Sequence, residues 1–113
     1  MAKTQLTILA RQGDPKALTH LGVMYQLGLG VEKDMMKAVS FYQAAADKGY
    51  APGQYNMGLL LYEGKAVKQD YKRAYEMFEK AAKQGHVKAK NRAEDMVVDV
   101  KMHTILERNK VRH

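Results

Sequence analysis

A block of 36 residues occurs twice in the sequence and constrains the fold more than any other feature. Residues 14–49 and 50–85 align without a gap and share eight identities. A fixed period of this length is typical of proteins built from stacked copies of one supersecondary unit. The identical pairs are Gly22/Gly58, Gly28/Gly64, Val31/Val67, Asp34/Asp70, Ala38/Ala74, Ala45/Ala81, Ala46/Ala82 and Gly49/Gly85.

Each block has the pattern of two helices joined by a turn. Asp14 and Pro15 are suited to the start of a helix, and apolar residues follow with helical spacing until Gly28. Asp34 then begins a second helix, which ends at Gly49, because glycine tolerates the left-handed conformation that closes many helices. The second block repeats this scheme, with helices expected over about 52–63 and 70–84.

Two glycines lie inside the predicted helices rather than at their ends. Gly22 and Gly58 occupy the same position in the two blocks, and each costs about 1 kcal/mol of helix stability relative to alanine. Their recurrence predicts that a neighbouring helix approaches closely at this point. The repeated alanines are the expected small partners in the same packing scheme.

The repeat pattern extends into both flanks, so we expect one repeat domain over 1–113 with about six helices. Its parts are a half-unit helix at 2–13, the repeats 14–49 and 50–85, and a capping helix with a basic tail at 86–113. The last helix is expected from 88 to about 108, with a buried stripe of Ala89, Ala93, Met96, Val97 and Val100. A polar outer face on such a helix would close the end of the array.

Charge and composition limit the classes of function. The chain has 113 residues with 19 Lys and Arg against 12 Asp and Glu, which gives a net charge of +7. Most of the excess lies in residues 57–113, and it favours an acidic partner. The absence of cysteine excludes disulfides and thiolate metal sites. No segment is apolar enough for a signal peptide or membrane span, so we expect a cytoplasmic protein; a mature periplasmic or secreted form stays open.

No catalytic or metal-binding constellation is present in the sequence. The four histidines are not spaced as metal ligands, and we expect them to be solvated. Asp34 and Asp70 recur at helix starts, where a capping role explains them. The single serine, Ser40, lies beside Phe41 on the second helix of the first block and does not by itself indicate a catalytic triad. We therefore expect a protein that is not an enzyme and that needs no cofactor or metal.

The first block is similar to a known repeat. The run from Ala17 to Asp34 (ALTHLGVMYQLGLGVEKD), followed by Lys37-Ala38 and 42–49 (YQAAADKG), resembles a Sel1-like repeat, a relative of the tetratricopeptide repeat. The second block departs at Leu61, where the family usually has Tyr, and at Ala66, where it often has Gly. The resemblance implies an all-α fold, a right-handed α-solenoid of antiparallel helix pairs whose first helices line a concave face.

The resemblance also implies a protein-binding adaptor or scaffold, with bacterial members among its relatives. Helical phase assigns ten residues to the expected concave, partner-binding face: Thr19, Val23, Gln26, Tyr55, Asn56, Leu59, Tyr62, Asn91, Arg92 and Asp95. The alternative for Tyr55 and Tyr62 is that they pack between the first helices of neighbouring units.

Other functions also stay open. One is a dedicated inhibitor or immunity-type protein for one enzyme, and a less favoured one is a basic nucleic-acid binder. A homodimer formed through the open ends of the solenoid is a further possibility. The residues expected at those ends are Leu6, Ile8, Val100, Ile105 and Leu106.

Overall fold

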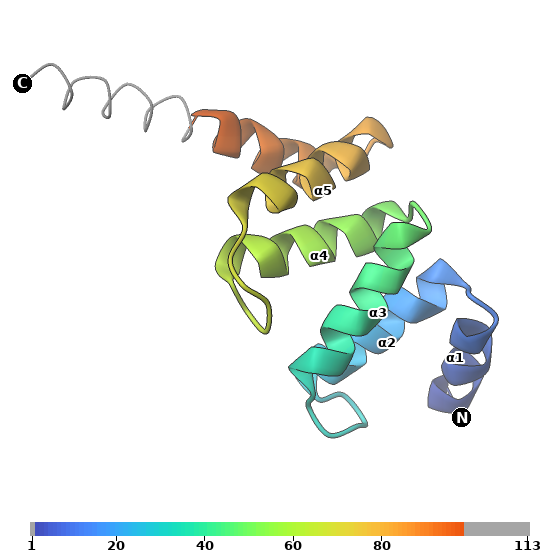
Figure 1. Ribbon diagram of the computed structural model, residues 1–113. Coiled ribbons are helices and arrows are strands. Elements are labelled where there is room, and N and C mark those ends of the chain that lie inside the picture. Colours follow the sequence, from blue (N-terminus) through green and yellow to red (C-terminus); the bar gives the residue numbers. More distant parts are fainter. Residues whose placement is uncertain (1, 99–113) are drawn as a thin grey trace, which may run out of the picture.

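The computed structural model describes residues 2–98, and this part of the chain consists of helices joined by short loops, with no strand (Figure 1). The tail after 98, including Val100, Ile105 and Leu106, lies outside the described residues. The helices are α1 (Ala2–Arg11), α2 (Pro15–Leu27), α3 (Met35–Asp47), α4 (Ala51–Glu63), α5 (Tyr71–Lys83) and a sixth helix, of which residues 87–98 are described.

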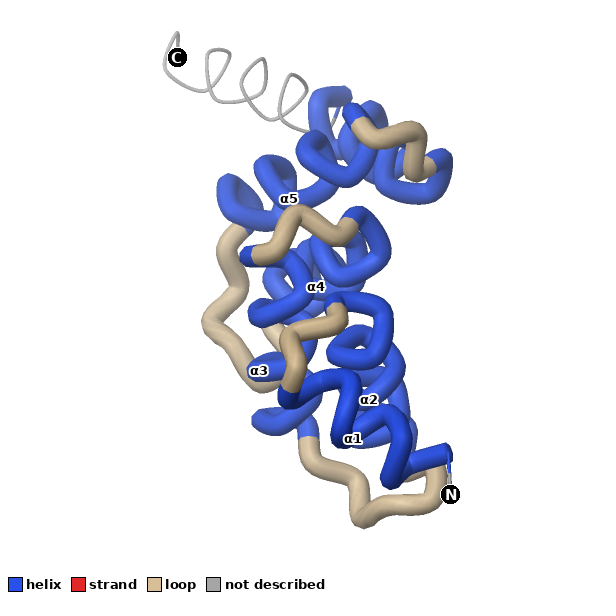
Figure 2. Tube along the Cα trace, turned by 90° about the vertical axis from the view of Figure 1, so that its right-hand side faces the viewer, coloured by secondary structure: helices blue, strands red, loops and turns tan. Residues whose placement is uncertain are grey.

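The helices stack in chain order into a column (Figure 2). Helix α1 packs on α2, α2 on α3, α3 on α4 and α4 on α5. We call α2, α4 and 87–98 the A helices, and α1, α3 and α5 the B helices. The predicted all-α solenoid of about six helices is confirmed. Among the described residues, no helix is both long enough and apolar enough to cross a membrane.

Local chemistry sets the helix ends where the sequence predicted them. The carboxylate of Asp14 accepts hydrogen bonds from the backbone amides of Lys16 and Ala17. Asp34 and Asp70 cap α3 and α5 in the same way, so their predicted capping role is confirmed. Gly28 and Gly64 end α2 and α4 in the left-handed conformation.

The turn of the second repeat contains the departure noted at Ala66. Its φ is +59°, and it is the one non-glycine residue with positive φ in the described part of the chain. The equivalent residue of the first repeat is Gly30, with φ of +72°. The loop therefore keeps its conformation and imposes on alanine a backbone geometry that glycine adopts at lower cost.

The core explains the two helix-interior glycines. A Cβ atom on Gly58 would lie 2.7 Å from Cε1 of Phe78, and a Cβ on Gly22 would overlap the ring of Tyr42. Both rings come from the B helix of the same repeat, and both are almost completely buried. The predicted close approach is confirmed, with an aromatic ring rather than an alanine in contact with each glycine. Ala45 instead contacts Gly53 at the start of α4.

The sixth helix continues the core beyond the second repeat. Ala89, Ala93 and Met96 are buried in the cluster that contains Met57 and Phe78. Val97 is half-buried, and Val100 lies outside the described residues. Glu94 stands where the two repeats have their interior glycine, and it is exposed.

Candidate functional site

A half-buried arginine and three aromatic rings meet where α4, α5 and the sixth helix join; we call Tyr62, Tyr71, Phe78 and Arg92 the Arg92 cluster. The guanidinium carbon of Arg92 lies 5.0 Å from the ring centre of Tyr62 and 5.9 Å from that of Phe78. The rings of Tyr62 and Tyr71 are 5.3 Å apart. Cation–π contacts of this kind hold a guanidinium in place without neutralising its charge.

The loop between α4 and α5 positions the two tyrosines. Tyr62 is in the last turn of α4 and Tyr71 in the first turn of α5. The side-chain amide of Gln69 donates a hydrogen bond of 2.8 Å to the backbone carbonyl of Tyr62. The left-handed residues Gly64 and Ala66 turn the chain between the two helices. This turn therefore holds Tyr62 and Tyr71 at one edge of the Arg92 cluster.

Arg92 has no carboxylate partner among the residues that the structure describes. The ion pairs in this part of the chain join Lys65 to Glu63 and Lys83 to Glu79, and all four side chains are well exposed. A half-buried guanidinium has lost part of its hydration, so a carboxylate supplied by a partner would bind it with less competition from water. The Arg92 cluster therefore presents a positive charge without a carboxylate partner among the described residues, next to aromatic surface.

His86 and Tyr55 form the adjoining part of the site. Their rings stack with centres 4.7 Å apart, and Tyr55 also lies 5.8 Å from Phe78. Nδ1 of His86 accepts a hydrogen bond of 3.1 Å from the backbone amide of Ala89. The imidazole thus caps the sixth helix, which carries Arg92. His86 is half-buried rather than fully solvated, because ring stacking and helix capping hold its imidazole.

The ten residues predicted to contact a partner differ in how much of their surface is exposed. Thr19 is buried, with 8% exposure, and its hydroxyl donates to the carbonyl of Pro15. This corrects its assignment, because a small side chain satisfied by its own helix is covered by its neighbours. Gln26 is half-buried, and its side chain accepts a hydrogen bond of 2.6 Å from the hydroxyl of Tyr42.

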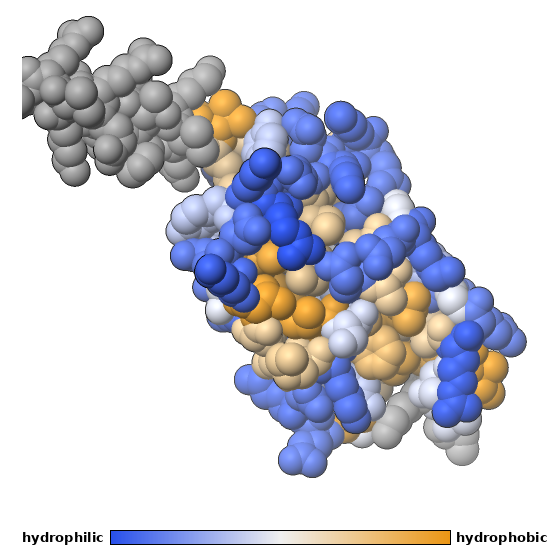
Figure 3. Space-filling model, in the orientation of Figure 1, coloured by the Kyte–Doolittle hydropathy of each residue, from blue (hydrophilic) through white to orange (hydrophobic). Residues whose placement is uncertain are grey.

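Like Gln26, the other eight residues keep some exposed surface. Asn91 and Asp95 are exposed, and the remaining six are half-buried: Val23, Tyr55, Asn56, Leu59, Tyr62 and Arg92. The ring of Tyr55 contacts Phe78 of α5 and His86, and the ring of Tyr62 contacts Tyr71 of α5 and Arg92 of the sixth helix. On the face seen in Figure 3, apolar surface lies over α3 and α4 with hydrophilic side chains around it. The structure brings Tyr62 and Arg92 together, and it places Thr19 away from the surface.

Sequence reasoning missed His86, although the repeat register contains a signal for it. Asp14, Tyr50 and His86 occupy the same position, 36 residues apart, immediately before an A helix. Asp14 caps its helix through the side chain, whereas Tyr50 makes no such hydrogen bond. If this position is taken as a helix N-cap, the repeat predicts that the side chain of His86 accepts a hydrogen bond from a backbone amide of the helix that follows.

We expect the capping role of His86 to make the fold sensitive to acid. Burial, and then the charge of Lys88, lower the pKa of His86 from its usual 6.5. The neutral imidazole is therefore favoured by folding, and its contribution to stability is complete above about pH 6.5 and is lost as the pH falls below it. Urea unfolding of the wild type and of His86→Asn at pH 8 and pH 5 measures this contribution.

Asparagine is the matched replacement because it also accepts a hydrogen bond at a helix N-cap but does not titrate. We expect His86→Asn to unfold like the wild type at pH 8 and to lose less stability on going to pH 5. Parallel losses in the two proteins would show that other groups cause the acid sensitivity.

The comparisons with known proteins identify the repeat. The family model of the Sel1 repeat matches residues 15–50 and 51–86. Two curated relatives are both named DAP3-binding cell death enhancer 1. The rat protein is 38% identical over 53 residues, and the mouse protein is 36% identical over 55. These alignments cover 47% and 49% of this chain but only 10% and 11% of those proteins.

Solved structures agree with the family match. A Sel1 repeat protein from Oxalobacter formigenes has a TM-score of 0.81 and 34% identity, over 85% of this chain and 40% of that one. A protective antigen of uropathogenic Escherichia coli with an SLR fold has a TM-score of 0.80 and 35% identity, over 83% of this chain and 20% of that one. Helicobacter pylori cysteine rich protein B has a TM-score of 0.75 and 29% identity, over 79% of this chain and 67% of that one. The chain belongs to the Sel1 repeat family.

Proposed function

We propose that the chain is a non-catalytic protein-interaction module, an adaptor or scaffold, that binds an acidic segment of a partner protein on the surface of its A helices. Sel1 repeats generally serve as protein-interaction modules, and two relatives are named for binding another protein. The observation that carries the proposal is Arg92, a half-buried guanidinium on Tyr62 with no carboxylate partner among the described residues.

The surroundings of Arg92 favour a peptide rather than a free anion. Tyr62 and Tyr55 add half-buried aromatic surface beside the charge, and Val23 and Leu59 add aliphatic surface on α2 and α4. Tyrosine and arginine are the residues that most often dominate binding energy at protein interfaces. A segment with a carboxylate for Arg92 and apolar side chains for the A helices matches this surface. Gln26, Asn56, Asn91 and Asp95 are its proposed polar edge.

The proposal predicts that charge reversal at Arg92 removes a specific contact. A charge-assisted hydrogen bond contributes about 1.5–3 kcal/mol, so Arg92→Glu should weaken a bound acidic peptide by about tenfold or more. Acidic peptides selected from a displayed random 16-residue library by the wild-type chain would serve as probes. Their dissociation constants for each variant can be measured by fluorescence anisotropy at two salt concentrations.

Lys90→Glu is the matched control. It makes the same change of charge two residues from Arg92, which places it on nearly the opposite side of the helix. We expect it to change affinity by less than about threefold through long-range electrostatics alone. Equal weakening by the two variants would contradict a specific site. Preferential enrichment of RNA or DNA over peptides, with binding that falls steeply with salt, would instead favour the nucleic-acid alternative.

A further inference from the structure

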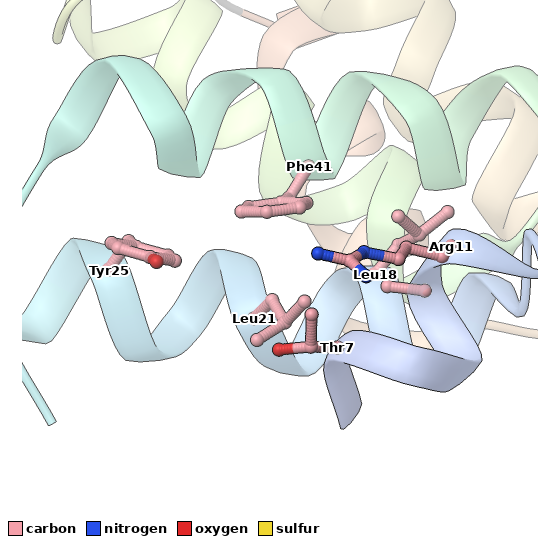
Figure 4. Close-up of a pocket in the computed structure, with 7 residues that line it drawn as sticks. Thr7, Arg11, Leu18, Leu21, Tyr25 and Phe41 are labelled. Atoms are coloured by element: carbon pink, nitrogen blue, oxygen red, sulfur yellow. The ribbon is translucent and has the colours of Figure 1, made fainter. Parts of the chain in front are cut away.

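A small apolar pocket lies at the N-terminal end of the array, between α1, α2 and α3 (Figure 4). Its volume is about 230 Å³. Phe41 of α3 covers one side, Leu21 of α2 lies opposite, and Tyr25 lies toward one end. The guanidinium of Arg11, at the last turn of α1, reaches in from the other end.

The walls of the pocket are held by packing within the first repeat. The rings of Tyr25 and Phe41 stack with centres 5.7 Å apart and planes 19° from parallel. The ammonium group of Lys37 lies 5.1 Å from the ring centre of Tyr25, on which it adds a cation–π contact. Leu21 is buried, with 3% exposure. These contacts keep the aromatic and aliphatic walls in place before any ligand arrives, which lowers the entropy cost of binding.

The same place in the second repeat has different chemistry. Shifting the pocket residues by 36 positions replaces Leu18 with Gln54 and Phe41 with Met77, and it puts Asp47 at the position of Arg11. Gln54 is buried and accepts a hydrogen bond of 3.0 Å from the side-chain amide of Gln84. The equivalent positions of the second repeat therefore do not reproduce this combination of apolar walls and a cation.

Arg11 is the one charged residue among those that line the pocket. No carboxylate pairs with it among the described residues, where the ion pairs involve other side chains. Arg11 is an exposed residue whose guanidinium reaches toward the pocket. A ligand that matches this lining offers an apolar group to Phe41 and Leu21 and a negative charge beside that group to Arg11. Arginine binds a carboxylate through two parallel hydrogen bonds, which would orient the group at the mouth of the pocket.

We propose that this pocket binds the C-terminal residue of a partner polypeptide whose last side chain is leucine or phenylalanine. In a C-terminal residue the side chain and the free carboxylate branch from the same carbon atom, so one residue meets both requirements. The volume of about 230 Å³ accommodates one such side chain. This site is separate from the Arg92 cluster, and the proposal does not depend on the function proposed there.

The test uses fluorescein-labelled hexapeptides of a common Gly-Ser sequence that end in leucine, phenylalanine or serine, each as free acid and as amide. Anisotropy titrations with the full chain measure their dissociation constants. We expect the leucine or phenylalanine acid to bind at least tenfold more tightly than its own amide and than the serine acid. Arg11→Gln should remove the preference for acid over amide, while binding of the amide stays the same.

One variant and one further peptide complete the test. Lys16→Gln removes an exposed cation two residues before Leu18 but outside the pocket lining, and this variant should bind the peptides as the wild type does. An amidated peptide with an internal Leu-Asp pair presents the same groups away from a chain end. Equal binding of that peptide, equal binding of acid and amide, or no binding at 1 mM of any peptide would overturn the proposal.

Discussion

Replacement of Phe78 by alanine is expected to lower the free energy of unfolding by about 3–5 kcal/mol, the range for truncating a large buried ring. The ring has no exposed surface, and it lies against Gly58 and Tyr55 and beneath Arg92. Truncation would leave a cavity that the surrounding helices cannot close, because each is tied to its neighbours by a short turn. Such a loss is a large part of the roughly 5–15 kcal/mol that stabilises a typical domain.

The position of Phe78 also predicts which helices lose stability when its ring is removed. In a stacked array each unit contacts chiefly its neighbours, so damage spreads over a short range. Hydrogen exchange read by mass spectrometry should show faster exchange in α4, α5 and 87–98 than in α2 and α3. Met36→Ala, which truncates a side chain that is 66% exposed, is the control and should change stability by less than about 0.5 kcal/mol. A uniform increase in exchange along the chain would contradict local damage.

Gly58→Ala should also destabilise the protein, although the same change in an isolated helix would stabilise it by about 1 kcal/mol. The added Cβ would lie 2.7 Å from an atom of the Phe78 ring, closer than real contacts allow. The ring is completely buried, so it has little space into which it can move. Overpacking of this kind costs about 1–3 kcal/mol, and urea unfolding would measure it.

A double variant separates overpacking from other causes. If the clash with Phe78 produces the loss, then Gly58→Ala should cost much less in a Phe78→Leu background, because the shorter side chain vacates the contact. The two changes would then be strongly non-additive, as expected for residues in contact. A variant Gly58→Ala as stable as the wild type would show that the ring and α4 adjust freely to each other.

The candidate sites show where sequence reasoning stopped. Helical phase selected Arg92 and Tyr62, but it did not show that they touch, since they lie 30 positions apart on different helices. It also placed Thr19 on the partner-binding face, whereas the structure buries it. Helical phase gives the side of its own helix on which a residue lies. Whether that side is exposed depends on how closely the neighbouring helices approach it.

The N-terminal pocket illustrates the same limit. Arg11, Leu21 and Phe41 come from three helices, and no motif joins them in the sequence. These three side chains line one pocket because of the way α1 packs on α2 and α2 packs on α3. Leu18 and Phe41 have Gln54 and Met77 as their counterparts in the second repeat, and neither difference by itself indicates a pocket in the sequence.

The repeat, the number of helices and most of the helix ends follow from the amino-acid sequence without any knowledge of the packing. These features depend on interactions within a few residues: an aspartate caps the amides that follow it, a glycine adopts positive φ, and a period of 36 residues repeats one helical hairpin. Packing between the helices set which ring covers which glycine, the stacking of His86 on Tyr55, and the lack of carboxylate partners for Arg11 and Arg92 among the described residues. These outcomes depend on helix-to-helix distances and angles, which arise only when all the side chains pack together.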